Sequence, residues 1–198
     1  MIKVIGFDLG GVYLTDCWSK IVRKKIANKF NVPLDILEKR NEKFVDKITE
    51  GKISEDDFLN KLFSGFDLNV EGLKDYIREL NKVIFPEMLS LMKKLKKNYF
   101  LVLMNNEGKE WNEFRIKRFH LNEIFEKIFS SCINGKMKPK REYFEIVVEQ
   151  LNIKPQELLF IDNEEPNIKS ASLLGIKTIL FQNPDQLKKD LLKFNILF

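Results

Sequence analysis

The chain has 198 residues, of which 44% are hydrophobic and 32% are charged, and its formal net charge is +5. A chain of this length and balance can bury a sizeable core, which excludes a disordered protein and favours one domain with an insertion. The lysines alternate with glutamates and aspartates, so we expect a solvated basic surface and no nucleic-acid partner.

The N-terminal sequence, the lengths of the apolar runs and the number of cysteines favour a cytoplasmic protein. The segment Met1 to Asp8 enters an apolar run without a basic leader or a cleavage site, so we expect no secretory signal. No apolar run reaches the roughly 18 to 20 residues that a membrane helix needs. Cys17 and Cys132 are therefore predicted to be reduced thiols.

The first predicted strand, Val4–Phe7, is followed by a helical insertion. Residues 15–84 contain four amphipathic segments before any second strand candidate. They cover approximately Cys17–Phe30, Leu34–Thr49, Ser54–Phe63 and Val70–Val83. We interpret residues 15–84 as a helical cap domain, inserted into a core domain formed by residues 1–14 and 85–198.

Strands and helices alternate after the insertion. Three further apolar runs, Leu101–Met104, Leu158–Ile161 and Thr178–Phe181, have the composition of parallel strands that are covered on both faces. Helical patterns separate them. The predicted fold class is therefore α/β, with a doubly wound, Rossmann-like parallel sheet and an inserted helical cap.

Polar residues follow three of the predicted strands directly. They are Asp8, Asn105 with Asn106, and Asp162 with Asn163. A single aspartate after a strand is usually a turn or helix-cap residue. In a doubly wound sheet, however, ligands bind outside the carboxyl ends of the strands. Three strands that deliver acids and amides to one edge therefore predict a functional site there.

Four motifs in the same order resemble the haloacid dehalogenase (HAD) superfamily of hydrolases. They are Phe7 to Val12, Leu103 to Asn106, Gly135 to Pro139 and Phe160 to Asn167. The resemblance covers nearly the whole chain and implies that the insertion is a helical C1 cap. Gly10, Gly51 to Ser54 and Phe85 to Glu87 look most similar to the α-D-glucose-1-phosphate phosphatase group and to the phosphatase half of epoxide hydrolases.

The resemblance implies a magnesium-dependent phosphatase that acts on a small phosphorylated metabolite, for which a sugar phosphate is one candidate. In such enzymes an aspartate attacks phosphorus and forms an aspartyl-phosphate, which water hydrolyses. Asp8 would be this nucleophile, and Lys138 would hold it and the phosphoryl oxygens by charge. The Asn105 side chain and the Asn106 backbone amide would donate hydrogen bonds to those oxygens. Asp8, Asp162 and the backbone carbonyl of Gly10 would bind Mg²⁺.

Three positions depart from the usual phosphatase pattern. Gly10 stands where the family has a second aspartate, the general acid and base, so we expect a preference for leaving groups of low pKa and a broader range in Gly10→Asp. Met104 stands where the family has a hydroxyl residue. Asn163 replaces an acid and predicts weaker magnesium binding, unless Glu164 or Glu165 compensates through water.

Two alternatives remain open from the sequence. One is a protein of this fold whose site has lost catalysis and now binds a ligand or another protein. The other is a 2-haloacid dehalogenase, in which Arg40 would receive the halide. The substrate and the choice between monomer and homodimer are undetermined. Four aromatic residues of the insertion are predicted to form its core more readily than a substrate pocket: Trp18, Phe44, Phe58 and Phe63.

Overall fold

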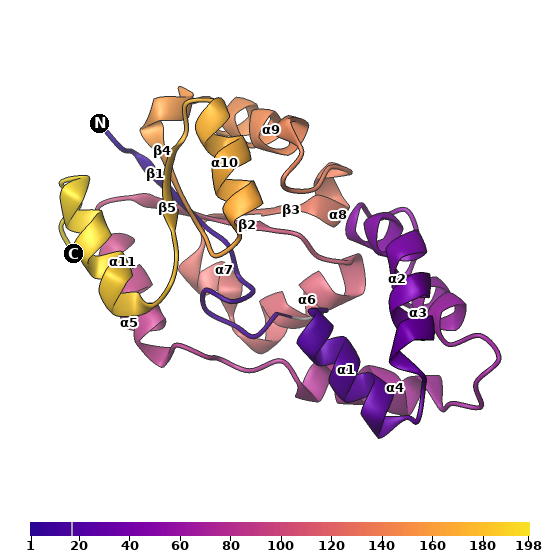
Figure 1. Cartoon of the computed structure of the whole chain (residues 1–198). Helices are drawn as coiled ribbons and strands as arrows, with labels where there is room; N and C mark the ends of the chain where they lie inside the picture. The colour runs from indigo at the N-terminus through magenta and orange to yellow at the C-terminus, as the bar shows by residue number, and fades with distance from the viewer. Residues whose placement is uncertain (17) are drawn as a thin grey trace.

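The computed structural model describes residues 1–16 and 18–198. Its centre is a five-stranded sheet in the order β3-β2-β1-β4-β5, in which every neighbouring pair is parallel. The strands are β1 (Val4–Phe7), β2 (Phe100–Asn105), β3 (Lys127–Ser130), β4 (Leu158–Asp162) and β5 (Lys177–Leu180). The predicted α/β fold class is confirmed, and β1 lies at the centre of the sheet (Figure 1).

Helices cover both faces of the sheet. The insertion forms α1 (Lys20–Lys29), α2 (Leu34–Thr49), α3 (Glu55–Leu62) and α4 (Val70–Glu79); the later helices are α5 (Pro86–Leu95), α6 (Lys109–Arg118), α7 (Leu121–Ile124), α8 (Ser131–Asn134), α9 (Arg141–Leu151), α10 (Glu165–Leu173) and α11 (Pro184–Lys193), with a 3₁₀ turn, η1 (Pro155–Glu157). In Figure 1, α9 and α10 lie on one side of the sheet, and α5, α7 and α11 lie on the other. None of the helices in the described ranges is long and apolar enough to cross a membrane.

The two faces of β1 belong to two different core clusters. Ile5 and Phe7 of β1 pack into the cluster that contains residues of α5, α7 and α11. Val4, on the opposite face, packs with residues of α9 and α10. Successive side chains of a strand point to opposite faces. Strands that are buried on both faces therefore read as continuous apolar runs, which is why β1 and β4 were predictable.

Strand β3 was not predicted. It is only four residues long and lies at the edge of the sheet, where it pairs with β2 alone. Its first two residues, Lys127 and Ile128, are only partly buried. An edge strand does not need to be apolar on both faces, so the sequence gives no continuous hydrophobic run there.

The insertion contains the four predicted helices, and two of their ends differ from the prediction by more than one residue. Helix α1 begins at Lys20, because the Ser19 hydroxyl accepts a hydrogen bond from the Val22 amide and caps the helix; the predicted start at Cys17 lies outside the described residues. Helix α4 ends at Glu79 instead of continuing to Val83. Val83 forms an antiparallel bridge with Leu14.

The helices of the insertion share a hydrophobic cluster of their own. Trp18, Phe58 and Phe63 are buried in it, and Phe44 packs against it. Trp111 of α6 joins this cluster and stacks on Trp18 with ring centroids 5.2 Å apart. The aromatic residues therefore form packed core, as predicted. The division into core and cap domains stays a prediction, since one of these rings comes from α6.

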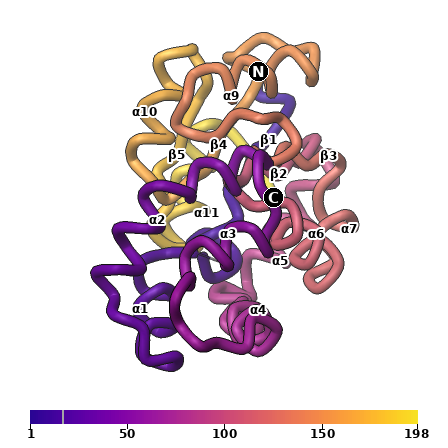
Figure 2. The backbone as a smooth tube through the Cα atoms, turned by 90° about the vertical axis from the view of Figure 1, so that its right-hand side faces the viewer, coloured from indigo at the N-terminus to yellow at the C-terminus, as the bar shows by residue number. Residues whose placement is uncertain are grey.

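The insertion contacts the rest of the chain through the end of α2. Glu50 accepts hydrogen bonds from Lys140 and Lys52 at 2.6 Å each, and the Ser131 hydroxyl donates to the Thr49 carbonyl at 2.7 Å. Figure 2 shows α2 beside the part of the chain that leads into α9. Gly51 follows directly with φ +71°, and a side chain there would overlap the Cys132 carbonyl oxygen. The close approach at this point therefore requires glycine.

We expect Gly51→Ala to destabilise the protein more than Gly65→Ala. Both glycines have positive φ, so both substitutions carry the roughly 1–2 kcal/mol that a left-handed L residue costs. Only Gly51 also faces backbone, whereas nothing lies within 4 Å of a Cβ on Gly65. Urea unfolding of the two variants measures the difference. Equal losses of unfolding free energy would contradict a tight contact at Cys132.

Candidate active site

Three charged side chains meet at the carboxyl end of the sheet. Asp8 follows β1, Asp162 ends β4, and Lys138 lies between α8 and α9. Lys138 Nζ is 2.7 Å from Asp8 Oδ1 and 2.7 Å from Asp162 Oδ2. Lys138 is 1% exposed and Asp162 is 0% exposed. One buried ammonium group therefore bridges two carboxylates that the sequence had placed in the same site.

Polar groups of the following turn hold the Asp162 carboxylate in place. The Glu164 amide donates to Asp162 Oδ1 at 2.7 Å, and Asn167 Nδ2 donates to Oδ2 at 3.0 Å. With Lys138, three donors reach this carboxylate, which has about four acceptor positions. Asn167 was not singled out from the sequence, because an asparagine in the first turn of a helix is ordinary.

Burial and the neighbouring charges shift the pKa values of Asp8 and Lys138. Burial raises the pKa of Asp8 to about 7 against the opposing charge of Lys138, and the Asp162 carboxylate adds to the rise. Burial by itself lowers the pKa of Lys138, but Asp8 and Asp162 together outweigh it and hold that pKa above its ordinary value. Lys138 is therefore a cation. A further positive charge near Asp8 would favour its ionised form.

Asn106 holds the lysine through the backbone. Its Nδ2 donates to the Lys138 carbonyl at 2.8 Å, and its Oδ1 accepts from the Lys138 amide at 2.9 Å. This pair of bonds joins the loop after β2 to the segment that carries the lysine. The predicted role of Asn106, through its backbone amide, stays a prediction. Its side chain has a role in positioning Lys138 that the sequence did not reveal.

Met104, which stands where the family has a hydroxyl residue, does not line the site pocket. The Met104 side chain is buried in the cluster below α9, and its sulfur occupies the space beside Gly6. Asn105 points to the other face of the strand and lines the site pocket. Its Nδ2 donates to Asn112 Oδ1 at 3.2 Å, while its buried Oδ1 has no hydrogen-bond partner among the described residues. Asn105 is therefore the residue of this strand that faces the pocket, and its predicted contact with phosphate stays a prediction.

A pocket of about 210 Å³ opens above these groups. Its lining is polar or glycine throughout: Asp8, Gly10, Asp16, Asn105, Asn106, Glu107, Arg115, Lys138, Asn163, Glu164 and Asn167. A larger groove of about 810 Å³ contains none of the predicted site residues and lies beside Lys3 and Glu157, which precede β1 and β4. Of these two, the small pocket combines a cavity with the convergent charges of a reactive site.

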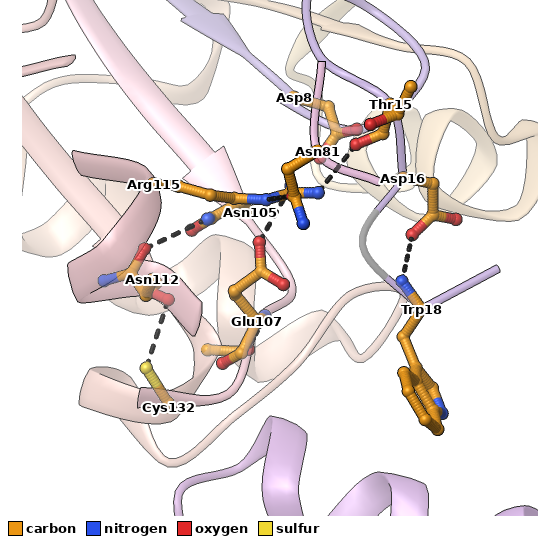
Figure 3. Close-up of polar contacts among 12 residues, drawn as sticks. Asp8, Thr15, Asp16, Trp18, Asn81, Asn105, Glu107, Asn112, Arg115 and Cys132 are labelled. Atoms are coloured by element: carbon orange, nitrogen blue, oxygen red, sulfur yellow. Dashed lines mark hydrogen bonds and ion pairs between the residues drawn. The ribbon is translucent and has the colours of Figure 1, made fainter. Parts of the chain in front are cut away.

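Arg115 is a site residue that sequence reasoning missed. Its Nη1 is 2.9 Å from Glu107 Oε2, its Nε donates to Asn81 Oδ1 at 2.6 Å, and its Nη2 donates to the Thr15 carbonyl at 2.6 Å (Figure 3). Thr15 and Asn81 lie at the two connections to the helical insertion. Arg115 therefore joins both connections to the loop after β2. An arginine in a strongly charged helix gives no sequence signal of burial.

The predicted donors for a cation are two carboxylates and one carbonyl, Asp8, Asp162 and the Gly10 carbonyl, and they stay a prediction. In residues 1–16 and 18–198 no cluster of three or more His, Cys, Asp or Glu side chains forms a metal site. Asn163 lines the pocket, and its buried Oδ1 lacks a hydrogen-bond partner within the described chain.

Other candidate residues lie away from the pocket or outside the described chain. Arg40 donates from Nη1 to the Leu62 and Ser64 carbonyls, at 2.7 and 2.8 Å, inside the insertion. The thiol of Cys132 is free, while Cys17 lies outside the described residues. Neither Arg40 nor Cys132 lines the pocket.

Comparison with known families identifies one that spans most of the chain. Residues 2–175 match the family model described as haloacid dehalogenase-like hydrolase. Among solved structures, a HAD family enzyme from Bacteroides thetaiotaomicron, in complex with magnesium and inorganic phosphate, gives a TM-score of 0.78 at 25% identity, over 94% of this chain and 99% of that chain.

Curated relatives are similar at low identity. Flavin mononucleotide hydrolase 1 of Arabidopsis thaliana is 28% identical over 186 residues, 91% of this chain and 76% of that protein. D-ribitol-5-phosphate phosphatase of Bacteroides thetaiotaomicron is 28% identical over 201 residues, 96% of this chain and 97% of that protein. Bifunctional epoxide hydrolase 2 of Mus musculus is 29% identical over 120 residues, 59% of this chain and 21% of that protein.

We expect Arg115→Met to lower the free energy of unfolding by about 3–5 kcal/mol, because removing one partner of a buried ion pair leaves the other charge buried. Arg141→Met is the matched control, since its pair with Glu145 is exposed and is worth at most about 1 kcal/mol. Urea unfolding measures both. A loss for Arg115→Met no larger than that of the control would contradict the proposed importance of the buried pair.

We expect Asp8 to make the metal-free protein less stable as pH rises. Its folded pKa of about 7 exceeds the ordinary value of 3.8, so between these values the folded chain binds a proton that the unfolded chain has lost. Stability from this proton is present below about pH 4 and is lost as pH rises through 7. In EDTA, the unfolding free energy of Asp8→Asn minus that of wild type should therefore increase as the pH rises from 5 to 8. If the unfolding free energies of the two proteins change with pH in parallel, Asp8 has no raised pKa.

Proposed function

The chain belongs to the haloacid dehalogenase-like hydrolase family, and from this premise we propose that it is a magnesium-dependent phosphatase of a small phosphorylated metabolite. The observation that carries the proposal is the Lys138 ammonium, which lies 2.7 Å from both Asp8 and Asp162 in a small polar pocket. Buried titratable groups with strongly shifted pKa values in a cleft are typical of functional sites.

The residues present fit a magnesium ion. Mg²⁺ is usually held by one or two carboxylates together with water and substrate phosphate. Asp8, Asp162 and the Gly10 carbonyl offer such a set of oxygen donors, and the Asp162 carboxylate has acceptor capacity left beside its three donors. When bound, the ion would offset the repulsion between the Asp8 carboxylate and an incoming phosphate.

The reaction that we propose is a double displacement at phosphorus. The Asp8 carboxylate attacks, its oxygen bonds to phosphorus, and the bond from phosphorus to the leaving oxygen breaks. Water then attacks the same phosphorus and releases inorganic phosphate, which restores Asp8. Lys138 orients the carboxylate and attracts the phosphoryl oxygens. Asn105 and the Asn106 amide would donate hydrogen bonds to these oxygens.

The pocket supports a small, polar substrate. Its volume of about 210 Å³ and its wholly polar lining suit a phosphate group and a short hydroxylated chain, such as a sugar or polyol phosphate. The name of the relative D-ribitol-5-phosphate phosphatase supports the same class. The aromatic residues of the insertion are packed into its core, so they do not offer an apolar surface to the substrate.

The two alternatives have less support. A buried cluster of three charges is costly to desolvate and is weak as a source of stability, so its presence favours a working site over a decayed one. For a dehalogenase, Arg40 would have to reach the substrate, but both of its carbonyl partners lie within the insertion.

We expect the wild-type protein with Mg²⁺ to release nitrophenol from 4-nitrophenyl phosphate, because this leaving group needs little acid assistance. Asp8→Asn should lower the rate by about 10⁴-fold or more, the order seen when a principal catalytic group is removed, and EDTA should stop the reaction.

Asp185→Asn, an exposed aspartate in the first turn of α11, is the matched control and should keep the wild-type rate. Circular dichroism checks that each variant is folded. Folded wild-type protein that releases no phosphate from a broad panel of esters, or Asp8→Asn with the wild-type rate, would overturn the proposed function.

A further inference from the structure

Cleavage of an alkyl phosphate requires a proton donor, because an alcohol leaves poorly as an alkoxide. Residue 10, two positions after Asp8, is glycine and cannot supply the proton. We propose that Asp16 is the general acid and base of this site. The inference rests on the phosphatase function proposed above and deepens it, since it assigns the proton transfers to a residue outside the four sequence motifs.

The pocket offers few other carboxyl groups for this role. Apart from Asp8, its lining contains Asp16, Glu107 and Glu164. Glu107 lies 2.9 Å from the Arg115 guanidinium, is buried with it and is engaged in that ion pair. Glu164 is the N-cap of α10, its backbone amide donates to Asp162 Oδ1 at 2.7 Å, and its side chain accepts from Asn163 Nδ2 at 3.4 Å. Of the three, Asp16 is the carboxyl group that lies beside residue 10.

Asp16 lies next to the place that a side chain on residue 10 would occupy. A Cβ atom built on Gly10 would be 3.3 Å from Asp16 Cα, 3.5 Å from its Cβ and 3.7 Å from its Cγ. The Asp16 side chain therefore lies in van der Waals contact with the place that a side chain on residue 10 would occupy. The same geometry indicates that an aspartate at residue 10 would crowd the Asp16 backbone.

The surroundings of Asp16 leave it accessible to a substrate. It is exposed, lines the pocket that contains Asp8, and accepts a hydrogen bond at Oδ1 from the Trp18 amide at 3.1 Å. Figure 3 shows it on the segment that leads from the loop after β1 into the insertion. The Trp18 bond orients the carboxyl without the close cation that holds Glu107.

The proton balance closes over one turnover. Protonated Asp16 gives its proton to the leaving oxygen as the bond from that oxygen to phosphorus breaks and the bond from Asp8 to phosphorus forms. The alcohol departs, and the Asp16 carboxylate then takes a proton from the attacking water. The bond from water oxygen to phosphorus forms, the bond to Asp8 breaks, and phosphate leaves with Asp16 protonated again.

This assignment changes the substrate expectation. The sequence alone predicts a preference for leaving groups of low pKa, because residue 10 has no carboxyl group. With Asp16 as the acid, alkyl phosphates are substrates as well. Gly10→Asp is then expected to impair the site by crowding Asp16 instead of broadening its range.

The test compares wild type and Asp16→Asn, both with Mg²⁺, on 4-nitrophenyl phosphate and on a panel of primary alkyl phosphates. Wild type should hydrolyse both classes. Asp16→Asn should lose about 10²- to 10⁴-fold on alkyl phosphates. On the aryl phosphate it should give a stoichiometric burst of nitrophenol in rapid mixing, followed by slow turnover, because only the attack of water still needs the base.

Asp67→Asn, an exposed aspartate of the insertion, is the matched control and should behave as wild type, and Asp16→Glu should recover part of the alkyl phosphatase rate. The inference fails if wild type hydrolyses 4-nitrophenyl phosphate but no alkyl phosphate. It also fails if Asp16→Asn hydrolyses alkyl phosphates at the wild-type rate, or if its rate falls by the same factor on alkyl and aryl phosphates without a burst of nitrophenol. Wild type that is inactive on every ester would instead overturn the proposed function itself.

Discussion

The bridge from Lys138 to Asp8 and Asp162 is the interaction on which the site depends. Strands β1 and β4 pair in parallel with Phe7 opposite Ile161, so the residues that follow, Asp8 and Asp162, are brought side by side by the sheet itself. Two carboxylates that lie side by side in a buried site would repel each other. Lys138 supplies the opposing charge, and its own backbone is fixed by Asn106. Sheet register, lysine segment and the loop after β2 therefore form one unit.

The same loop connects the charged centre to the helical insertion. Glu107 follows Asn106 and lies in the buried pair with Arg115, which also contacts both connections to the insertion, at Thr15 and Asn81. The two connections to the insertion are thus tied to the loop whose Asn106 positions Lys138.

Sequence reasoning recovered the features that have strong local signals. Buried parallel strands such as β1 and β4 are continuous apolar runs, and the acids at their ends stand out against them. It could not recover the partly exposed edge strand β3, nor the burial of the Met104 side chain in the core below α9. Arg115 and Asp16 were invisible for a different reason. Arg115 contacts segments far apart in the chain, and Asp16 lines a pocket that several such segments form. The local sequence patterns of both are those of solvated residues.

The central claim is that Asp8 carries the phosphoryl group during turnover, and acid quenching followed by peptide mapping tests it most directly. Wild-type protein that is quenched during hydrolysis of 4-nitrophenyl phosphate should contain a phosphorylated peptide, with the modification on Asp8. Mass spectrometry of the digested protein locates the group. Phosphate release without any phosphorylated peptide, or with the phosphoryl group on another residue, would contradict nucleophilic attack by Asp8.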